Sequence, residues 1–462
     1  MGRLQRNSMI IAVGAALMLW CGSLFFNRDV LHQERQAPVS LEATCAESAE
    51  APATLADVRT IPQDLGPFAA GLGETMPADM RHRIARQFHR QYFAPWTATE
   101  PLFNAVTVTE GVRQLATRTW YGENRLRVDP ARMQSLLILA DWEHFPSMQA
   151  AGVVVKPAFI RILPTVRPFY VAPDDVPFDH LQFSEAKLNE PVRILHASRD
   201  GAWLYVETSS ANGWVDPDAI GLADASMQNR LIDAEQLVVV KDYITVRTEQ
   251  GEALPQPKIG TLYPLVKEER DHWLVDAAVA GDGRRAVLKT ARIAKSDARR
   301  HPLPFSPETV TLIGNELLKT PYGWGELYRN RDCSATTRDF FLALGIWLPR
   351  NSLKQITSGP FVPLTGLSGS DKKNRIRAQG IPFRTLLHLK GHIMLYVGLQ
   401  NDQPVVLHTI WSLRYAPKNC TEQSFIIGRT IVSTLEVGKE LPLTKGTLLD
   451  RLEGMLTLPV VD

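Results

Sequence analysis

The sequence predicts a multidomain α+β protein in which a helical region and two small β-rich units precede a larger mixed domain. Three observations lead to this fold class. The 462-residue chain is too long for one ordinary hydrophobic core. Its pattern of apolar residues changes twice, from helical to short β-type runs and then to mixed helix and strand. Its composition, 45% apolar and 22% charged, is that of a globular protein.

Residues 1–28 have the pattern of a signal or membrane anchor. Arg3 and Arg6 precede an uncharged apolar stretch, Met9–Phe26, which as a helix would span about 27 Å. The basic flank predicts that the remainder of the chain is exported to the periplasmic or cell-envelope face. No A-x-A-like cleavage site follows closely, so we expect an uncleaved membrane anchor, with lipidation at Cys21 as the alternative.

The next two segments are expected to be a flexible linker, residues 29–60, and a helical N-terminal domain, residues 61–145. The linker is rich in Ala, Glu and Pro. Four arginines between Arg81 and Arg90 are interpreted as a solvated helix face, with Ile84 and Phe88 turned inward. The net charge of +2 gives no reason to expect a nucleic-acid partner.

Residues 146–225 and 226–297 each show the rhythm of a small β-barrel. In the first unit, Val192–Leu195 and Trp203–Val206 flank a polar turn, and Asn212-Gly213 predicts a further turn. A similar layout returns about 70 residues later. Both units resemble bacterial SH3 modules.

Residues 298–462 carry the motif that suggests chemistry. Asp332 is expected to cap a helix that ends at Gly345, which places Cys333 in the first turn. The unpaired N–H groups and the helix dipole at that end favour a thiolate. The alternative is an ordinary small apolar cysteine packed under a helix.

The cysteine count predicts at least one free thiol. Cys21 lies in the apolar stretch, which leaves Cys45, Cys333 and Cys420 in an exported chain. Pairing of Cys45 with Cys420 would leave Cys333 free, but the sequence does not decide this pairing.

Two histidines lie on apolar strands downstream. Folding the hairpin symmetrically about residue 400 places His392 directly opposite His408, so that one imidazole can orient the other. The alternative for His392 is a core histidine satisfied by backbone groups. His388 is four residues away, but Gly391 and the alternating pattern oppose a helical zinc pair, so neither metal nor cofactor is expected.

These motifs resemble the NlpC/p60 family of cell-wall cysteine peptidases. The resemblance is carried by Tyr322-Gly323-Trp324-Gly325, Asp332-Cys333-Ser334, Leu348–Ser352, Gly391–Gly398 and His408. It implies a papain-like core with Cys333 as nucleophile, His392 as general base and His408 as the orienting residue.

The resemblance also implies a substrate. Peptidoglycan stem peptides or muropeptides would be cut, most often between γ-D-glutamate and a diamino acid such as diaminopimelate. Asp332 and Ser334 would help to bind the free amine of the stem's L-alanine, and Tyr322 would line the site. The SH3-like units are expected either to bind the wall or to close one end of the cleft and restrict it to short stems.

Two positions depart from the family's usual pattern. Ala335 and Glu326 stand where glycine is common, and Glu326 is expected to alter access or charge near the site. Two other functions stay open: acyl transfer or amidase chemistry on another substrate, and an inert wall-binding protein.

Overall fold

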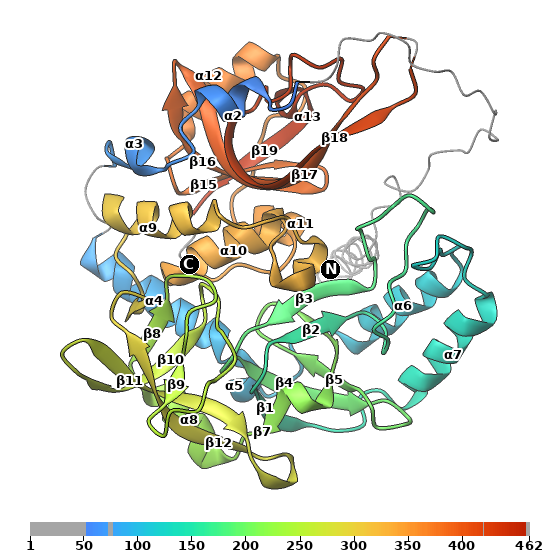
Figure 1. The fold of residues 1–462 in the computed structure, drawn as a ribbon, viewed down its shortest axis with the longest axis vertical. Coiled ribbons are helices and arrows are strands. Elements are labelled where there is room, and N and C mark those ends of the chain that lie inside the picture. Colours follow the sequence, from blue (N-terminus) through green and yellow to red (C-terminus); the bar gives the residue numbers. More distant parts are fainter. Residues whose placement is uncertain (1–51, 73–76, 419, 459–462) are drawn as a thin grey trace, which may run out of the picture.

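The computed structural model describes residues 52–72, 77–418 and 420–458. A C-terminal α/β domain lies over two β-barrels that stand side by side, with helices of the N-terminal region running between and around them (Figure 1). The predicted fold class is therefore confirmed. The predicted anchor, residues 1–28, lies outside the described residues. Within the described ranges, no helix combines the length and apolar character needed to cross a bilayer.

The N-terminal helices wrap around the other domains and share their cores. They are α2 (Ala56–Thr60), α3 (Gly66–Ala69), α4 (Ala78–Tyr92), α5 (Ala94–Thr97), α6 (Ala105–Ala116), α7 (Pro130–Ala140) and the 3-10 turn η2 (Trp142–His144). On α4, Ile84 and Phe88 are buried and the arginines are exposed, as predicted.

Part of the predicted linker is folded. Helix α2 lies against the C-terminal domain, and Asp57 accepts hydrogen bonds from the main-chain N–H and hydroxyl of Thr434, both at 2.7 Å. The expectation of a tether through residue 60 is wrong for this segment because Leu55 is an apolar anchor, only 1% exposed. The earlier linker residues lie outside the described ranges.

The first barrel is a seven-stranded antiparallel sheet with the order β3-β2-β6-β5-β4-β1-β7. Its strands are β1 (Ala150–Val154), β2 (Ala158–Arg161), β3 (Gln182–Ala186), β4 (Pro191–Ala197), β5 (Leu204–Glu207), β6 (Asn212–Val215) and β7 (Ile220–Leu222), with the 3-10 turn η3 (Pro217–Ala219). Asn212 and Gly213 begin β6 and do not form the predicted turn. The turn comes earlier because the Thr208 hydroxyl accepts from the N–H groups of Ser210 and Ala211.

The second barrel follows helix α8 (Ala225–Asp233) and has the strand order β13-β8-β10-β11-β12-β9. Its strands are β8 (Gln236–Val239), β9 (Arg247–Thr248), β10 (Leu262–Glu268), β11 (His272–Ala280), β12 (Ala286–Ala294) and β13 (Ala298–Arg300), with the 3-10 turn η4 (Asp282–Arg284).

The C-terminal domain packs helices against a sheet with the order β14-β19-β15-β16-β17-β18. Its helices are α9 (Pro307–Leu317), the irregular turn η5 (Trp324–Arg329), α10 (Cys333–Ala343), α11 (Ser352–Ile356), α12 (Gly369–Gln379) and α13 (Leu448–Arg451). Its strands are β14 (Val362–Pro363), β15 (Thr385–Leu389), β16 (His392–Gln400), β17 (Gln403–Tyr415), β18 (Gln423–Thr434) and β19 (Leu452–Thr457).

The register of the β16–β17 hairpin differs from the predicted one by three residues next to the turn, and a β-bulge between Tyr396 and Gly398 reduces the difference to two at the end that carries the histidines. Leu395 pairs with Leu407, and the turn consists of Asn401 and Asp402, which both have positive φ. These residue types favour a two-residue turn with left-handed backbone, so the hairpin closes later than a fold centred on residue 400. At the histidine end, the shift of two keeps the side chains on their predicted face, so the two histidines still lie on the same side.

A buried cluster of ion pairs joins the C-terminal domain to both barrels. Its acids are Glu185, Asp242, Glu326 and Asp339, and its bases are Lys187, Lys258, Arg331, Arg338 and Arg350. Glu326, fully buried at positive φ, accepts from Arg338 at 2.7 Å and from Ser184 of the first barrel at 2.8 Å. Arg331 pairs with Asp242 of the second barrel. We call this set the interdomain ion cluster.

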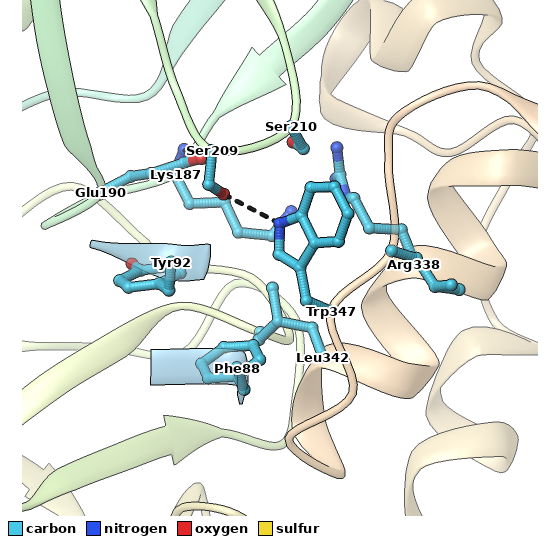
Figure 2. Close-up of a pocket in the computed structure, with 11 residues that line it drawn as sticks. Phe88, Tyr92, Lys187, Glu190, Ser209, Ser210, Arg338, Leu342 and Trp347 are labelled. Atoms are coloured by element: carbon cyan, nitrogen blue, oxygen red, sulfur yellow. Dashed lines mark hydrogen bonds between the residues drawn. The ribbon is translucent and has the colours of Figure 1, made fainter. Parts of the chain in front are cut away.

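Trp347 forms a second contact between these parts. Figure 2 shows its ring lying between α4 and the first barrel, with the indole N–H donating to Ser209 at 3.3 Å. Phe88 and Tyr92 of α4 line the same small pocket. The C-terminal domain is therefore fixed against the first barrel by apolar as well as ionic contacts.

The interdomain ion cluster yields a stability prediction. Burial raises the pKa of Glu326, but Arg338, Lys187 and Arg350 together hold it well below its usual value, so the carboxylate stays charged at neutral pH. Replacing Glu326 with Gln leaves buried cations uncompensated and is expected to cost about 3–5 kcal/mol in the free energy of unfolding, measured by urea denaturation. The matched change Glu110→Gln, at an exposed position on α6, is expected to cost less than about 0.5 kcal/mol. Equal stability of the two variants would contradict this role.

Candidate active site

Cys333 occupies the first turn of α10, as predicted. The Asp332 side chain caps the helix by accepting from the N–H of Ala335 at 2.9 Å. Gly345, at φ +73°, follows the helix end. Of the two cysteines in the described ranges, Cys333 is a free thiol and Cys420 is disulfide-bonded, whereas Cys45 lies outside those ranges.

Arg350 fixes the residues on either side of the thiol. Its guanidinium donates to both carboxylate oxygens of Asp332, at 2.7 and 3.1 Å, and to the Ser334 hydroxyl at 2.8 Å. The Asp332 carboxylate also accepts from the N–H of Gly325 and from the Ser334 hydroxyl, each at 3.1 Å. Sequence reasoning gave Arg350 no role. The signal in the sequence was an arginine directly after the apolar run Ile346–Pro349, and the structure leaves this arginine only 3% exposed.

His392 and His408 are in direct contact. Nε2 of His392 lies 2.9 Å from Nδ1 of His408, and Nε2 of His408 lies 2.9 Å from the Ser433 hydroxyl. The Ser433 hydroxyl donates to the Thr434 carbonyl at 2.9 Å, so its oxygen accepts from His408. His408 must then accept from the Nε2–H of His392, which leaves Nδ1 of His392 as the unprotonated nitrogen. This chain of hydrogen bonds defines a base at a known atom.

Sequence reasoning missed Ser433. It lies on β18, beside the histidine-bearing strand β17, where His408 pairs with Ile431. Only the pairing of two strands that are distant in sequence brings the hydroxyl to the imidazole, so no local pattern could have identified it.

The thiol and the imidazole are both neutral in the free site. Burial and the negative charge of Asp332 raise the pKa of Cys333 to about 12, although the Ile393 backbone and Arg350 oppose the shift. Burial, with the nearby positive charge of Arg451, lowers the pKa of His392 to about 3. Burial and the Asp332 charge therefore oppose the thiolate that the start of the helix was predicted to favour.

Both residues open into one cleft of about 490 Å³. Asp332, Ser334 and Tyr322 line the same cleft, so the predicted site residues share it, except His408, which lies fully buried behind His392. Phe178, Gln182 and Phe183 of the first barrel also line it, and the Phe178 ring packs edge-on against Trp324 at 5.2 Å. The second barrel supplies none of the described lining residues.

Glu326 does not lie in this cleft. It is fully buried in the interdomain ion cluster, so the expectation that it alters access to the site is wrong. Its left-handed backbone explains why glycine suits this position, and its ion pairs offset the strain. Ala335 is also fully buried and is compatible with the helix.

No metal site was found among the described residues. His388 pairs with Glu453, with Nδ1 3.2 Å from the carboxylate, and is not among the residues that line the cleft. A thiol at a helix start, in the same cleft as a neutral and oriented imidazole, can act as a nucleophile once the imidazole takes its proton.

Comparison with known proteins identifies the class to which this architecture belongs. Four family models match in order: NLPC_P60 stabilising domain, N term, at 36–145; SH3 domain, SH3b1 type, at 168–216; SH3 domain of SH3b2 type at 227–270; and NlpC/P60 family at 319–415. The chain belongs to the NlpC/P60 family, as its motifs indicated. No curated protein matches the chain.

Among solved structures, the fold resembles that of an NlpC/P60 endopeptidase from Photobacterium damselae subsp. piscicida. The TM-score is 0.75 at 22% identity, over 86% of this chain and 97% of the other. An NlpC/P60 family protein from Bacillus cereus matches 67% of this chain and all of its own length at 15% identity, with a TM-score of 0.45. The first of these supports the fold over the 86% of the chain that it covers.

The neutral thiol predicts slow alkylation. Because the thiolate is the reactive form, the rate of iodoacetamide labelling at Cys333 is expected to rise about tenfold per pH unit from pH 7 to 10 without a plateau. The measurement is mass spectrometry of the peptide that contains Cys333, with Cys333→Ala as the control for labelling elsewhere. Fast labelling that is already constant at pH 6 would contradict a neutral pair and indicate a thiolate–imidazolium pair.

Proposed function

We propose that this protein is a peptidoglycan endopeptidase that cuts cell-wall stem peptides by a Cys-His-His mechanism. The observation that carries this proposal is the chain of hydrogen bonds from Ser433 through His408 to His392. It leaves Nδ1 as the unprotonated nitrogen of a histidine that lines the same cleft as the free thiol of Cys333. Membership of the family supports the reaction class.

The mechanism starts from the neutral pair. His392 takes the proton of the Cys333 thiol through Nδ1 as the sulfur attacks the amide carbonyl, and His408 stabilises the resulting imidazolium. Backbone N–H groups at the start of α10 face the developing oxyanion. The imidazolium then gives its proton to the leaving amine, and water hydrolyses the acyl-enzyme in a second step.

The bond proposed is that between γ-D-glutamate and the diamino acid. On this assignment, the free amine of the stem's L-alanine lies near Asp332 and Ser334, with Tyr322 against the peptide. The placement of all three residues in the cleft supports this role. Since Asp332 already accepts hydrogen bonds from Arg350 and three other donors, its contribution to amine binding is mainly its charge.

The first barrel is proposed to restrict the cleft to short stems. Phe178 and Phe183 reach into the cleft from this SH3 domain, and the Phe178 ring also contacts Tyr322 and Trp411 at 6.3 and 6.2 Å. A peptide that is still linked to glycan extends beyond its L-alanine and is blocked by this wall. A stem that begins at L-alanine ends before the wall and fits the cleft.

We also propose that the chain works at the envelope, exported and held at a membrane by residues 1–28. The disulfide at Cys420 supports export, because such bonds persist in oxidising compartments. The proposed partners are therefore peptidoglycan fragments and a membrane surface.

The test is mass spectrometry of defined substrates incubated with the full-length protein. Free stem peptides are expected to be cut after γ-D-glutamate, and intact crosslinked sacculi much more slowly. Cys333→Ala and His392→Ala are expected to lose at least about 100-fold in kcat/KM. His388→Gln, a neighbouring histidine outside the cleft, serves as the matched control and should keep the activity.

Four outcomes would contradict the proposal or a part of it. Activity that persists in Cys333→Ala excludes the nucleophile, and cleavage at another bond excludes the substrate assignment. If sacculi are cut as fast as free stems, the wall formed by the first barrel is not restrictive. If neither the unaltered protein nor any variant cleaves a substrate, the result favours one of the two alternative functions, wall binding or acyl transfer.

A further inference from the structure

One side of the cleft carries cations that the proposed reaction does not use. Arg414, Lys445 and Arg451 line it, together with Lys390. Among the described lining residues the one carboxylate is Asp332, which is already paired with Arg350. The cleft is therefore positively charged beyond the needs of the thiol and the histidines.

Two of these cations make no close contact with a carboxylate within the described part of the chain. Arg414 pairs with Glu422 at 3.0 Å. The side chains of Arg451 and Lys445, by contrast, make neither a hydrogen bond nor an ion pair there, and only longer-range attraction acts on them, from Glu453 and Glu422 respectively. They are available to an anionic ligand, and both lie after residue 415, beyond the segment that matches the NlpC/P60 model.

The backbone that carries Arg451 is rigid. Thr447 and Asp450 form a reciprocal capping box at the start of α13, and Leu448 and Leu449 are buried. The Lys372 ammonium donates to the carbonyls of Leu449 and Asp450, at 3.0 and 2.9 Å. The base of the Arg451 side chain is thereby fixed at the cleft wall, which is the requirement for a selective contact.

The proton transfers in the proposed mechanism indicate which part of a substrate lies next to these cations. The imidazolium returns its proton to the leaving amine, so the leaving residue must lie on the His392 side of Cys333. Arg451 lies on that side, because the next residue, Leu452, pairs with Leu389 on the neighbouring strand, and Leu389 in turn pairs with His392. The partner is therefore an anionic group on the leaving residue.

We propose that Arg451, together with Lys445, binds a free carboxylate on the leaving residue and makes the enzyme selective for leaving amino acids that carry one. This inference rests on the proposed function and adds the recognition of the leaving side. A diamino acid with an unamidated carboxylate fits this requirement, and its amidated form does not.

The experiment compares three synthetic peptides with the full-length protein. The reference is L-Ala-γ-D-Glu-diaminopimelate; the second peptide has carboxamides in place of the diaminopimelate carboxylates, and the third has only the glutamyl α-carboxylate amidated. The reference is expected to have a kcat/KM about 10- to 100-fold above that of the second peptide, which is the size expected for one charge-assisted hydrogen bond.

The variants locate this selectivity. In Arg451→Ala/Lys445→Ala, the ratio between the first two peptides is expected to fall below about threefold. Arg451→Lys should retain part of the ratio because it keeps the charge. The matched control is Arg375→Ala/Lys439→Ala, two exposed cations outside the cleft, which should keep both the ratio and the rate.

A binding measurement separates this inference from the proposed reaction. Calorimetry with Cys333→Ala is expected to show tighter binding of the reference than of the second peptide, and loss of that difference when Arg451 and Lys445 are also replaced. If no peptide is cleaved but this binding pattern holds, the inference stands and the proposed reaction fails. Three results would overturn the inference. The first is a ratio near one in the unaltered protein, and the second is a ratio that survives the double replacement. The third is an effect of Arg451 that depends on the glutamyl carboxylate alone.

Discussion

The interdomain ion cluster is the constraint on which the placement of the nucleophile depends. Arg350 belongs to this cluster through Glu326 and also clamps Asp332 and Ser334 on either side of Cys333. Each of these charges is buried and would be costly alone, so the cluster is stable only when the first barrel contributes Glu185, Lys187 and Ser184. The geometry of the site therefore depends on the docking of the first barrel. This SH3 domain contributes to the site as directly as the helix that carries the thiol.

The second constraint is the burial of the thiol and the histidines. In a more open site, a thiol at a helix start would ionise readily. Here burial keeps both groups neutral, so no thiolate–imidazolium ion pair forms in the free site. Instead, Ser433 orients His408, and His408 orients His392 so that one nitrogen of its imidazole stays unprotonated. A site of this kind reacts only when substrate occupies the cleft, since attack and proton transfer must occur together.

The elements that could be predicted from the sequence are those governed by local chemistry. The cap at Asp332, the first-turn position of Cys333 and the burial of Ile84 and Phe88 follow from spacing and residue type alone. The histidine contact was predicted correctly from an incorrect register, because an even shift preserves the face of a strand.

What the sequence could not predict depends on contacts between distant segments. Ser433 reaches His408 from a neighbouring strand, and Phe178 enters the cleft from another domain. Glu326 was expected near the substrate because its neighbours in sequence line the cleft, yet its side chain turns to cations from two other parts of the fold. The burial that raises the pKa of Cys333 could not be predicted for the same reason, since burial is a property of the assembled chain.

The central claim, that Cys333 forms an acyl-enzyme, is tested most directly by intact-mass spectrometry of the full-length protein quenched in acid during turnover of a stem peptide. The account predicts an added mass equal to the acyl fragment without its leaving residue, located on the peptide that contains Cys333 and absent from Cys333→Ala. Turnover without any adduct on that peptide, together with undiminished cleavage by Cys333→Ala, would contradict it.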